Sequence, residues 1–144
     1  MASYPGPGHP VTRWAEAFRD GRTFVSARYN IATDGERAMF HGNRVAWRDG
    51  NTGMVYVFHA GYGLYPTTRA RCDALFAVLG TPYRYYQKDF VCYLQHTASF
   101  PILATKADRE ALEELALYPV AIGGPLQMHA ARALANAGRI AQAA

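Results

Sequence analysis

Cysteine is scarce in this sequence of 144 residues, which contains only Cys72 and Cys92. Their spacing of twenty positions matches neither a zinc knuckle nor a disulfide framework, and it suits a reducing compartment. Long hydrophobic runs are missing too, since no stretch approaches the ~18 consecutive apolar residues of a membrane span. Residues 1–10 also lack the basic and apolar blocks of a signal peptide. We therefore expect a cytoplasmic protein with no membrane partner.

The common sequence motifs of enzyme active sites are also missing. The chain has no Walker loop to cradle phosphates, no G-x-S-x-G nucleophile elbow, and no G-x-G-x-x-G that opens a helix. Its five histidines and two cysteines fall into no ligand spacing of a metal site. These absences argue against phosphoryl transfer, dinucleotide chemistry and metal chemistry, so we expect neither a cofactor nor a bound metal.

One pair of residues keeps an enzymatic reading open. Cys72 could act as a nucleophile with His59 or His41 as its base, provided that the start of a helix and the end of a strand meet. However, Cys72 shares a helical stripe with Leu75 and Phe76, and a buried free cysteine behaves as a small hydrophobic residue. Packing in the core is therefore the favoured interpretation of Cys72.

What the chain does have is an uneven distribution of aromatic residues. Of its 19 aromatic side chains, 18 lie in residues 1–100, whereas residues 101–144 contain 13 alanines and one aromatic residue. The first part is typical of a sheet and the second of helices. We predict a single α+β domain over residues 12–144, with a sheet-rich core at 12–100 and a helical C-terminal part, preceded by a flexible leader at 1–11.

Hydrophobic periodicity and turn residues divide this domain into elements. A short helix is predicted from Thr12, because Trp14, Ala17 and Phe18 fall on one face before Gly21. Strands are predicted at 25–31, 37–41, 44–48 and 54–60, a helix at 67–79, a hairpin at 83–95 and an Ala-rich helical pair from residue 105 onward. The expected architecture is an antiparallel sheet of about five strands with the middle helix packed on one face. The Ala-rich helices permit a homodimer, because small residues let two helices approach closely.

Positive charge is concentrated in the sheet-rich part. The formal net charge is +4, and residues 1–98 carry 11 basic and 7 acidic side chains, whereas the remaining residues carry 4 of each. In the strand at 44–48, alternation with a period of two predicts Arg44 and Arg48 on one face of the sheet. Two guanidinium groups would then be exposed on the sheet.

Further cationic and aromatic residues lie in the segments that follow. Arg69 and Arg71 fall in the N-terminal part of the middle helix, and the hairpin adds Tyr83, Arg84, Tyr86 and Lys88. Aromatic and basic groups on a sheet face can stack on bases and neutralise phosphates. Tyrosine is equally common in half-buried strands, so a packing role for these residues stays open beside the binding role.

Three segments of the chain together resemble a family of small proteins encoded by bacteriophages. They are Phe40–Gly50, with its Asn43 and its hydrophobic-Ala pair, Met54–Val57, and Tyr65–Arg69, where aromatic-x-Thr-Thr opens a helix. The resemblance covers about residues 40–85 and implies a core of three strands and a helix. It also implies a home in a phage or prophage, and hence the cytoplasm of a bacterial host.

Small accessory phage proteins often bind and inhibit host machinery, including CRISPR effectors. The first hypothesis is therefore a non-enzymatic accessory protein that engages or inhibits a host protein or nucleoprotein complex of nucleic-acid handling or defence, as an anti-CRISPR protein does. Direct binding of nucleic acid is the second hypothesis, and a small hydrolase or transferase that uses Cys72 and His59 is the third. For both binding hypotheses the expected contact residues are Arg44, Arg48, Arg69, Arg71, Tyr83, Arg84, Tyr86 and Lys88.

Overall fold

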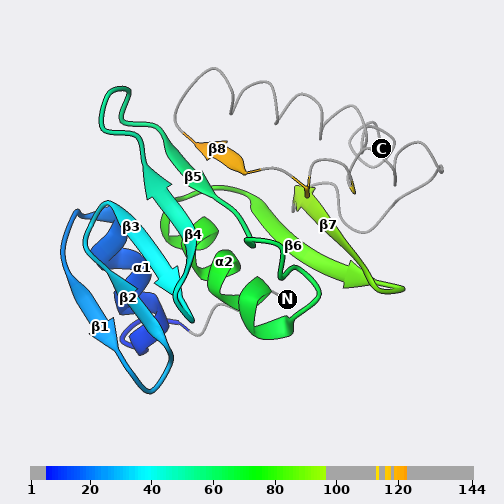
Figure 1. The fold of residues 1–144 in the computed structure, drawn as a ribbon, viewed down its shortest axis with the longest axis horizontal. Helices are drawn as coiled ribbons and strands as arrows, with labels where there is room; N and C mark the ends of the chain where they lie inside the picture. Colours follow the sequence, from blue (N-terminus) through cyan, green and yellow to red (C-terminus); the bar gives the residue numbers. More distant parts are fainter. Residues whose placement is uncertain (1–5, 97–112, 114–115, 118, 123–144) are drawn as a thin grey trace.

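The computed structural model of the chain describes residues 6–96, 113, 116–117 and 119–122, and it has an α+β fold (Figure 1). In chain order the elements are α1 (Pro10–Arg19), β1 (Phe24–Ser26), β2 (Ile31–Thr33), β3 (Arg37–Phe40), β4 (Asn43–Arg48), β5 (Val55–Val57), α2 (Pro66–Val78), β6 (Tyr83–Lys88), β7 (Val91–His96) and β8 (Val120–Ile122). The main sheet is antiparallel and has six strands in the order β1-β2-β3-β4-β5-β8, while β6 and β7 form a separate two-stranded sheet. The predicted class is confirmed, although the hairpin at 83–95 does not join the main sheet as expected.

The strand predicted at 25–31 is in fact two short strands joined by a turn. β1 ends at Ser26 and β2 begins at Ile31. Between them Asn30 adopts a φ of 56°, and its N–H donates to the carbonyl of Ala27 at 3.2 Å. Asparagine tolerates this left-handed conformation better than most residues. The alternation of apolar and polar residues continues through the turn, so the pattern alone does not reveal it.

α1 begins at Pro10, two residues before the predicted start and inside the segment expected to be a flexible leader. His9 is the N-cap, and its Nδ1 accepts the N–H of Val11 at 3.1 Å. The hydroxyl of Thr12 donates to the carbonyl of Gly6 and ties the preceding residues to the helix. Val11 is fully buried. The leader prediction is therefore wrong from His9 onward, and its first five residues lie outside the described part of the chain.

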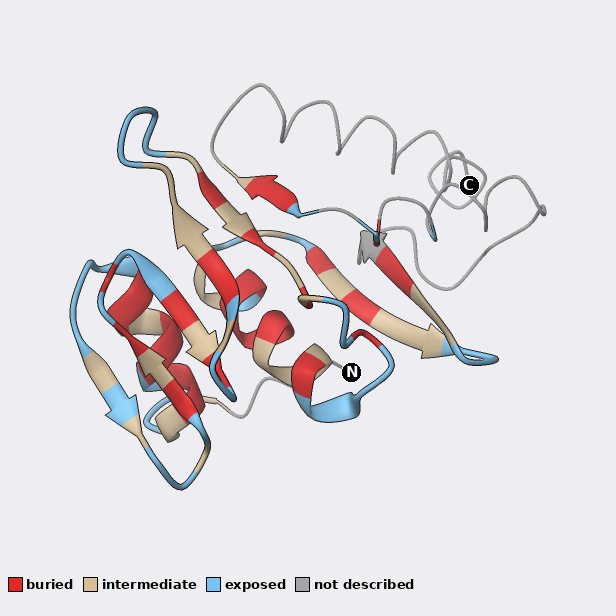
Figure 2. Cartoon of the chain, viewed as in Figure 1, coloured by how far each residue is buried: buried red, intermediate tan, exposed pale blue. Residues whose placement is uncertain are grey.

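Both helices cover the same face of the main sheet (Figures 1 and 2). α1 packs Trp14 and Phe18 against β1 to β3, and Nε1 of Trp14 donates to the carbonyl of Ala32 at 2.7 Å. α2 packs against β4 and β5 and buries Leu75 and Phe76 completely. Each large apolar side chain buried in this way contributes about 1.5–3 kcal/mol. The predicted packing of a helix on one face of the sheet is confirmed.

The β6–β7 hairpin is attached to the rest of the molecule through α2. Phe76 meets the ring of Tyr83 edge to face at 5.9 Å and the ring of Tyr85 at 5.5 Å. Both tyrosines are buried, whereas Arg84 and Tyr86, which alternate with them along β6, are only half-buried. Burial therefore alternates along β6 with a period of two, and Tyr83 lies on the packed face, opposite to Arg84 and Tyr86.

β4 contains a bulge that the sequence pattern does not show. In the pairing with β3, the register passes from Ala46 directly to Arg44, so Val45 has no partner. Val45 and Ala46 are consecutive and yet both buried. A bulge shifts the alternation by one residue. Consequently Arg44 and Arg48 lie on opposite faces of the sheet, and the predicted shared face is wrong.

β8 is a second feature that the sequence does not predict, because it is only three residues long and pairs with β5 from much earlier in the chain. The predicted Ala-rich helical pair, and the homodimer it would form, lie outside the described residues and stay predictions. Within the described ranges, no helix is both long enough and apolar enough to cross a membrane.

Candidate functional site

Cys72 lies on α2 in the interior of the protein. It is completely buried, and its Sγ lies 3.7 Å from the carbonyl oxygen of Phe58. Burial raises the pKa of the Cys72 thiol well above its ordinary value, and Asp73 and Cys92 nearby raise it further. The nucleophilic form of cysteine is the thiolate, which this environment disfavours. The favoured interpretation of Cys72 as a core residue is confirmed by its burial.

His59 follows β5 and is also buried, with 6 % of its surface exposed. Its Nε2 lies 2.6 Å from the carbonyl oxygen of Ala116, and its Nδ1 accepts the N–H of Gly61 at 3.1 Å. Because a carbonyl only accepts, Nε2 carries the proton and both ring nitrogens are occupied. Burial lowers the pKa of His59 and favours this neutral form. His59 therefore anchors a loop and has no nitrogen left to act as a base for Cys72.

Arg48 is held by backbone carbonyls on the helix side of the sheet. Its guanidinium donates to the carbonyls of Gly35, Phe18 and Arg19, the last two at 3.2 and 3.3 Å. It also lies over the ring of Phe18 at 5.0 Å. A contact between Arg48 and a partner would break these bonds, so its evident role is to join the end of α1 to the sheet.

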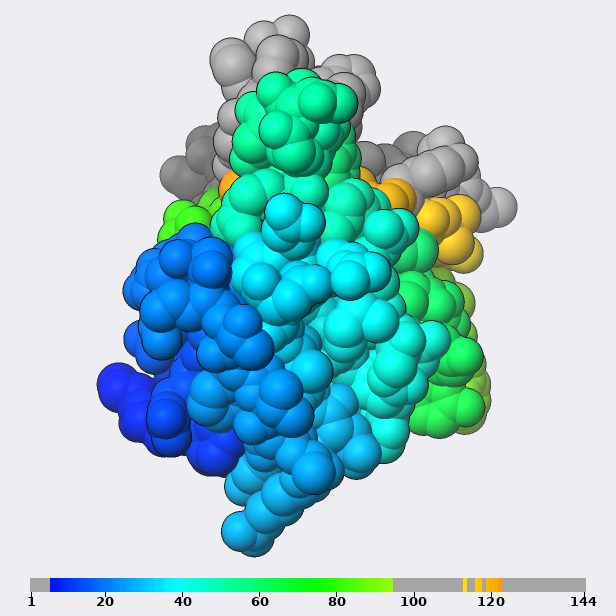
Figure 3. Space-filling model, turned by 60° about the vertical axis from the view of Figure 1, so that its left-hand side comes forward, coloured from blue at the N-terminus to red at the C-terminus, as the bar shows by residue number. Residues whose placement is uncertain are grey.

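Arg44 lies on the opposite face, where β3 and β4 form part of the molecular surface (Figure 3). Its guanidinium is 4.2 Å from the centroid of the Trp47 ring, and Trp47 stacks on Tyr56 at 5.4 Å. Arg44 is exposed, whereas Trp47 and Tyr56 are half-buried. The bulge thus assembles a cation and two aromatic rings that strict alternation would have separated.

Two further predicted contact residues contribute to packing. Arg71 lies over the rings of Phe40 and Tyr29 at 5.1 and 5.9 Å, and burial lowers the pKa of its guanidinium. Tyr83 is 4 % exposed and packs on Phe76. Lys88, by contrast, is exposed at the end of β6.

The structure brings three of the predicted contact residues together between α2 and β6. Arg69, Arg84 and Tyr86 line a pocket of about 280 Å³ together with Asp73. Arg69 donates through Nη1 to the carbonyl of Gly63 at 2.7 Å, and Tyr86 stacks on the ring of Tyr93 at 5.2 Å. This α2–β6 pocket combines two cations with Tyr86, which is one ring of a stacked aromatic pair.

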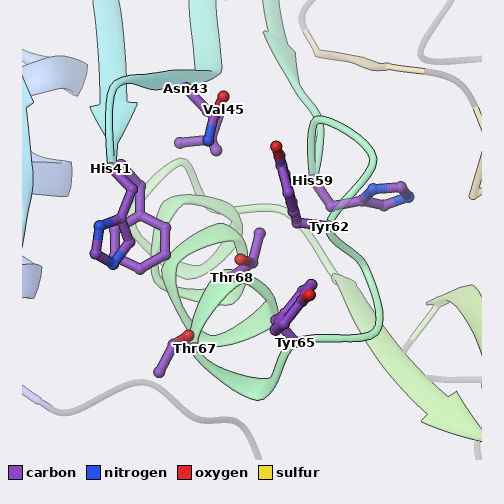
Figure 4. A pocket seen from close by; sticks show the side chains of 9 residues that line it. His41, Asn43, Val45, His59, Tyr62, Tyr65, Thr67 and Thr68 are labelled. Atoms are coloured by element: carbon purple, nitrogen blue, oxygen red, sulfur yellow. The ribbon is translucent and has the colours of Figure 1, made fainter.

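A larger pocket of about 380 Å³ lies at the start of α2 and was not anticipated from the sequence. It is lined by Phe40, His41, Asn43, Val45, His59, Tyr62, Tyr65, Thr67 and Thr68. His41 lies on one side, Tyr62 and Tyr65 on the other, and Thr67 and Thr68 belong to α2 between them (Figure 4). We refer to it as the aromatic pocket. The signal for it in the sequence was a pair of tyrosines in a loop punctuated by glycine and proline, where a core is not expected.

The aromatic pocket contains uncharged polar groups but no carboxylate. Thr68 is 5 % exposed, yet no hydrogen bond among the described residues involves its hydroxyl. The N-cap residue Tyr65 provides no side-chain hydrogen bond, and the first turn of α2 has no acidic residue. The free N–H groups of this turn carry a partial positive charge. The pocket therefore offers hydrogen-bond donors at one end and aromatic rings along its sides.

Exposed apolar side chains gather beside this pocket. Leu64, Phe90 and Leu117 are 49 %, 84 % and 62 % exposed, and they line a neighbouring hollow of about 230 Å³. Tyr62 and Tyr65, 44 % and 60 % exposed, flank Leu64 in the same loop. These five residues are named here the apolar surface. Only one further large apolar residue in the described part of the chain, Val25 on β1, is exposed.

Gly63 explains how this loop reaches its position. A Cβ atom at Gly63 would lie 2.7 Å from Sγ of Cys92 and 3.1 Å from Cδ2 of His59. Only glycine allows the loop to approach β7 so closely. The absence of a side chain at this position therefore sets Leu64 and Tyr65 at the surface.

Within the described ranges, no three or more His, Cys, Asp or Glu side chains lie close enough together to hold a metal ion. No protein-family model, no curated protein and no solved structure matches the chain. What the fold and the sites define is thus a class: an α+β protein with a six-stranded antiparallel sheet, helices on one face, and two pockets and an apolar surface around α2.

Proposed function

We propose that this protein is a non-enzymatic accessory protein of the phage type, which engages a host protein or nucleoprotein complex through the apolar surface. The observation that carries the proposal is Phe90. It is 84 % exposed and has a φ of 62°, in a two-residue hairpin turn where Asp89 also has a positive φ. A bulky residue is disfavoured in this conformation, and packing offers little compensation here. An exposed aromatic residue in a strained position is typical of a binding anchor.

The neighbours of Phe90 support the same proposal. Leu64 and Leu117 line the same hollow, and Tyr62 and Tyr65 extend the surface along one loop. Clusters of aromatic and aliphatic anchors are typical of protein–protein interfaces, whereas scattered single apolar residues are normal at any surface. The host cytoplasm is the proposed location, and inhibition of the bound complex is the proposed consequence.

A photo-crosslinking amino acid at position 90 or 64 tests this proposal in bacterial cells that express the protein. Position 25 is the matched control, because Val25 is 68 % exposed but lies on β1 at the other edge of the sheet. We expect a discrete protein adduct from positions 90 and 64 that survives nuclease treatment and is absent from position 25. Leu64→Ser should reduce the adduct formed at position 90. The same adducts from positions 25 and 90, or none from either, would refute the proposal.

The α2–β6 pocket supports direct binding of nucleic acid as a second candidate function. Arg69 and Arg84 converge there beside the stacked pair Tyr86–Tyr93, and Lys88 lies at the end of the same strand. Cations beside aromatic rings are what single-stranded nucleic acid requires of a protein surface. The other predicted cations are dispersed, since Arg48 and Arg71 pack internally and Arg44 occupies the opposite face.

Fluorescence anisotropy with labelled single- and double-stranded DNA and RNA, at roughly 50 and 200 mM salt, tests this second function. If it holds, binding is saturable, collapses with salt, and weakens in the Arg84→Ala/Lys88→Ala variant. Arg22→Ala removes a cation whose side chain is 62 % exposed at the end of α1 and serves as the control. A loss of affinity per removed charge that is equal in both variants would indicate non-specific charge attraction and remove the second candidate.

A further inference from the structure

We infer that the aromatic pocket binds a nucleoside monophosphate, with the base between its aromatic sides and the phosphate at the first turn of α2. The aromatic pocket shares Tyr62 and Tyr65 with the apolar surface, but the inference does not depend on the proposed function. The pocket volume of about 380 Å³ lies within the range of small-molecule sites. Its lining residues all lie between positions 40 and 68, so β3, β4, the loop after β5 and α2 build it together.

The sides of the pocket suit a flat ring. Tyr62 and Tyr65 are tilted rings 5.9 Å apart on one side, and Phe40 and His41 are paired at 4.4 Å on the other. Any of the four nucleobases can stack on such rings, because every base has a π face. The Asn43 amide lines the same space and offers both a donor and an acceptor for the polar edge of a base.

The floor of the pocket suits a phosphate. Thr67 and Thr68 belong to the first turn of α2, and no hydrogen bond among the described residues occupies their backbone N–H groups. Thr68 is 5 % exposed and lines the pocket beside them, and no hydrogen bond among the described residues involves its hydroxyl. A helix N-terminus with free N–H groups and no acidic neighbour attracts anions. A hydroxyl that lines the pocket can donate a hydrogen bond to a phosphate oxygen, and hydrogen bonds to a charged acceptor are the stronger ones.

Calorimetric titration and amide NMR with AMP, GMP, CMP and UMP test the inference, with the matching nucleosides and inorganic phosphate as comparisons. We expect at least one monophosphate to bind saturably and to shift the amide signals of Thr67 and Thr68. Its affinity should exceed that of its nucleoside by roughly tenfold, since hydrogen bonds to a charged group are the stronger ones. A 5′-phosphorylated tetranucleotide distinguishes binding of a strand terminus from binding of the free nucleotide. If the pocket encloses the sugar, the free nucleotide should bind and the tetranucleotide should not. Absence of saturable binding of every probe at millimolar concentration would overturn the inference.

Thr68→Val removes only the hydroxyl and nearly preserves the shape of the side chain. It should weaken binding of the monophosphate by roughly tenfold and leave binding of the nucleoside unchanged. Thr52→Val, in the exposed turn between β4 and β5, is the matched control and should bind as the parent does. If Thr68→Val does not fold, Tyr65→Leu provides the second test, because Tyr65 is 60 % exposed. Unchanged affinity in a folded variant at either position would place the ligand elsewhere and refute the site.

Thr68→Val and Leu64→Ser also separate the inference from the proposed function, whereas Tyr65 belongs to both the aromatic pocket and the apolar surface. Thr68→Val leaves Leu64 and Phe90 untouched, so crosslinking from position 90 should persist in it. Leu64→Ser, conversely, lies outside the lining of the aromatic pocket and should leave nucleotide binding intact. Failure of one test therefore leaves the other standing.

Discussion

Asp73 lies on α2 with 6 % of its surface exposed, and its Oδ1 accepts the backbone N–H of Tyr85 at 3.0 Å. Burial raises its pKa to about 6, although the Tyr85 N–H and the nearby Arg84 and Arg69 act in the opposite direction. In the unfolded chain the same carboxyl titrates near its ordinary value of 3.8. The native state therefore binds more protons between these two values, and the stability of the protein falls as the pH rises through this window. At neutral pH the ionised carboxylate destabilises the fold by at most about 3 kcal/mol.

Asp73→Asn should raise the free energy of unfolding at pH 7 by about 1–3 kcal/mol. The asparagine carbonyl can still accept the Tyr85 N–H, while the buried charge is lost. The gain should shrink as the pH falls from 6 toward 4, because Asp73 itself becomes neutral in the folded protein. Urea denaturation of both proteins across this pH range measures the difference.

Asp34 is a control, because its pKa is shifted in the opposite direction from that of Asp73. The backbone N–H groups of Arg37 and Glu36 lower its pKa to about 2. Its contribution to stability is present above its ordinary pKa of 3.8 and is lost as the pH falls toward 2, so Asp34→Asn should destabilise the protein at pH 7. If Asp73→Asn instead lowered the free energy of unfolding, as Asp34→Asn should, the hydrogen bond from the Tyr85 N–H to Asp73 would outweigh the cost of burying its charge.

Among the elements, the β6–β7 hairpin carries a local conflict between sequence and conformation. Asp89 and Phe90 have φ values of 53° and 62°, as a tight turn of the type that favours Asn-Gly requires. We expect Asp89→Asn/Phe90→Gly to stabilise the protein by about 1 kcal/mol, because glycine removes the strain at the second position. The midpoint of urea unfolding, with an unchanged slope, is the measurement.

The same double variant should lose its partner if Phe90 is an anchor. Greater stability with weaker binding is the pattern expected where a residue is retained for function against the preference of the fold. A loss of stability would instead show that the Phe90 ring is held by packing at its exposed position.

At the scale of the whole molecule, Phe76 links the two sheets. It is completely buried on α2 and contacts Tyr83 and Tyr85 of the hairpin. Phe76→Ala should reduce the free energy of unfolding by about 3–5 kcal/mol, through lost burial and the cavity left behind. Trp14 and Trp47 report on the main sheet by fluorescence, and hydrogen exchange of the β6 and β7 amides reports on the hairpin. The stability measured by tryptophan fluorescence and the protection of the hairpin amides should fall together. A loss of protection confined to the hairpin amides would show that the two sheets unfold separately.

Local patterns in the chain anticipated much of the fold. The short helix before Gly21, the helix predicted at 67–79 and the burial of Cys72 follow from periodicity and from residue preference, which act over a few neighbouring positions. The bulge at Val45 and the strand β8 were missed for one reason. β8 pairs with β5 from much earlier in the chain, and the bulge depends on how β4 pairs with the neighbouring strand β3, so the pattern within one segment records neither of them.

The candidate sites follow the same division. Composition and periodicity by themselves determined the α+β class, the antiparallel strands and the presence of cations and tyrosines in the sheet-rich part. Only the tertiary structure decided what those side chains do: Arg48 is bound to carbonyls of α1, Arg71 lies against aromatic rings, and Arg69 meets Arg84 beside Tyr86. The physical reason is that burial and hydrogen bonding depend on which segments meet in space. The loop that contains Gly63 places Tyr62 and Tyr65 in one pocket with Thr68, and no local sequence pattern encodes that pocket.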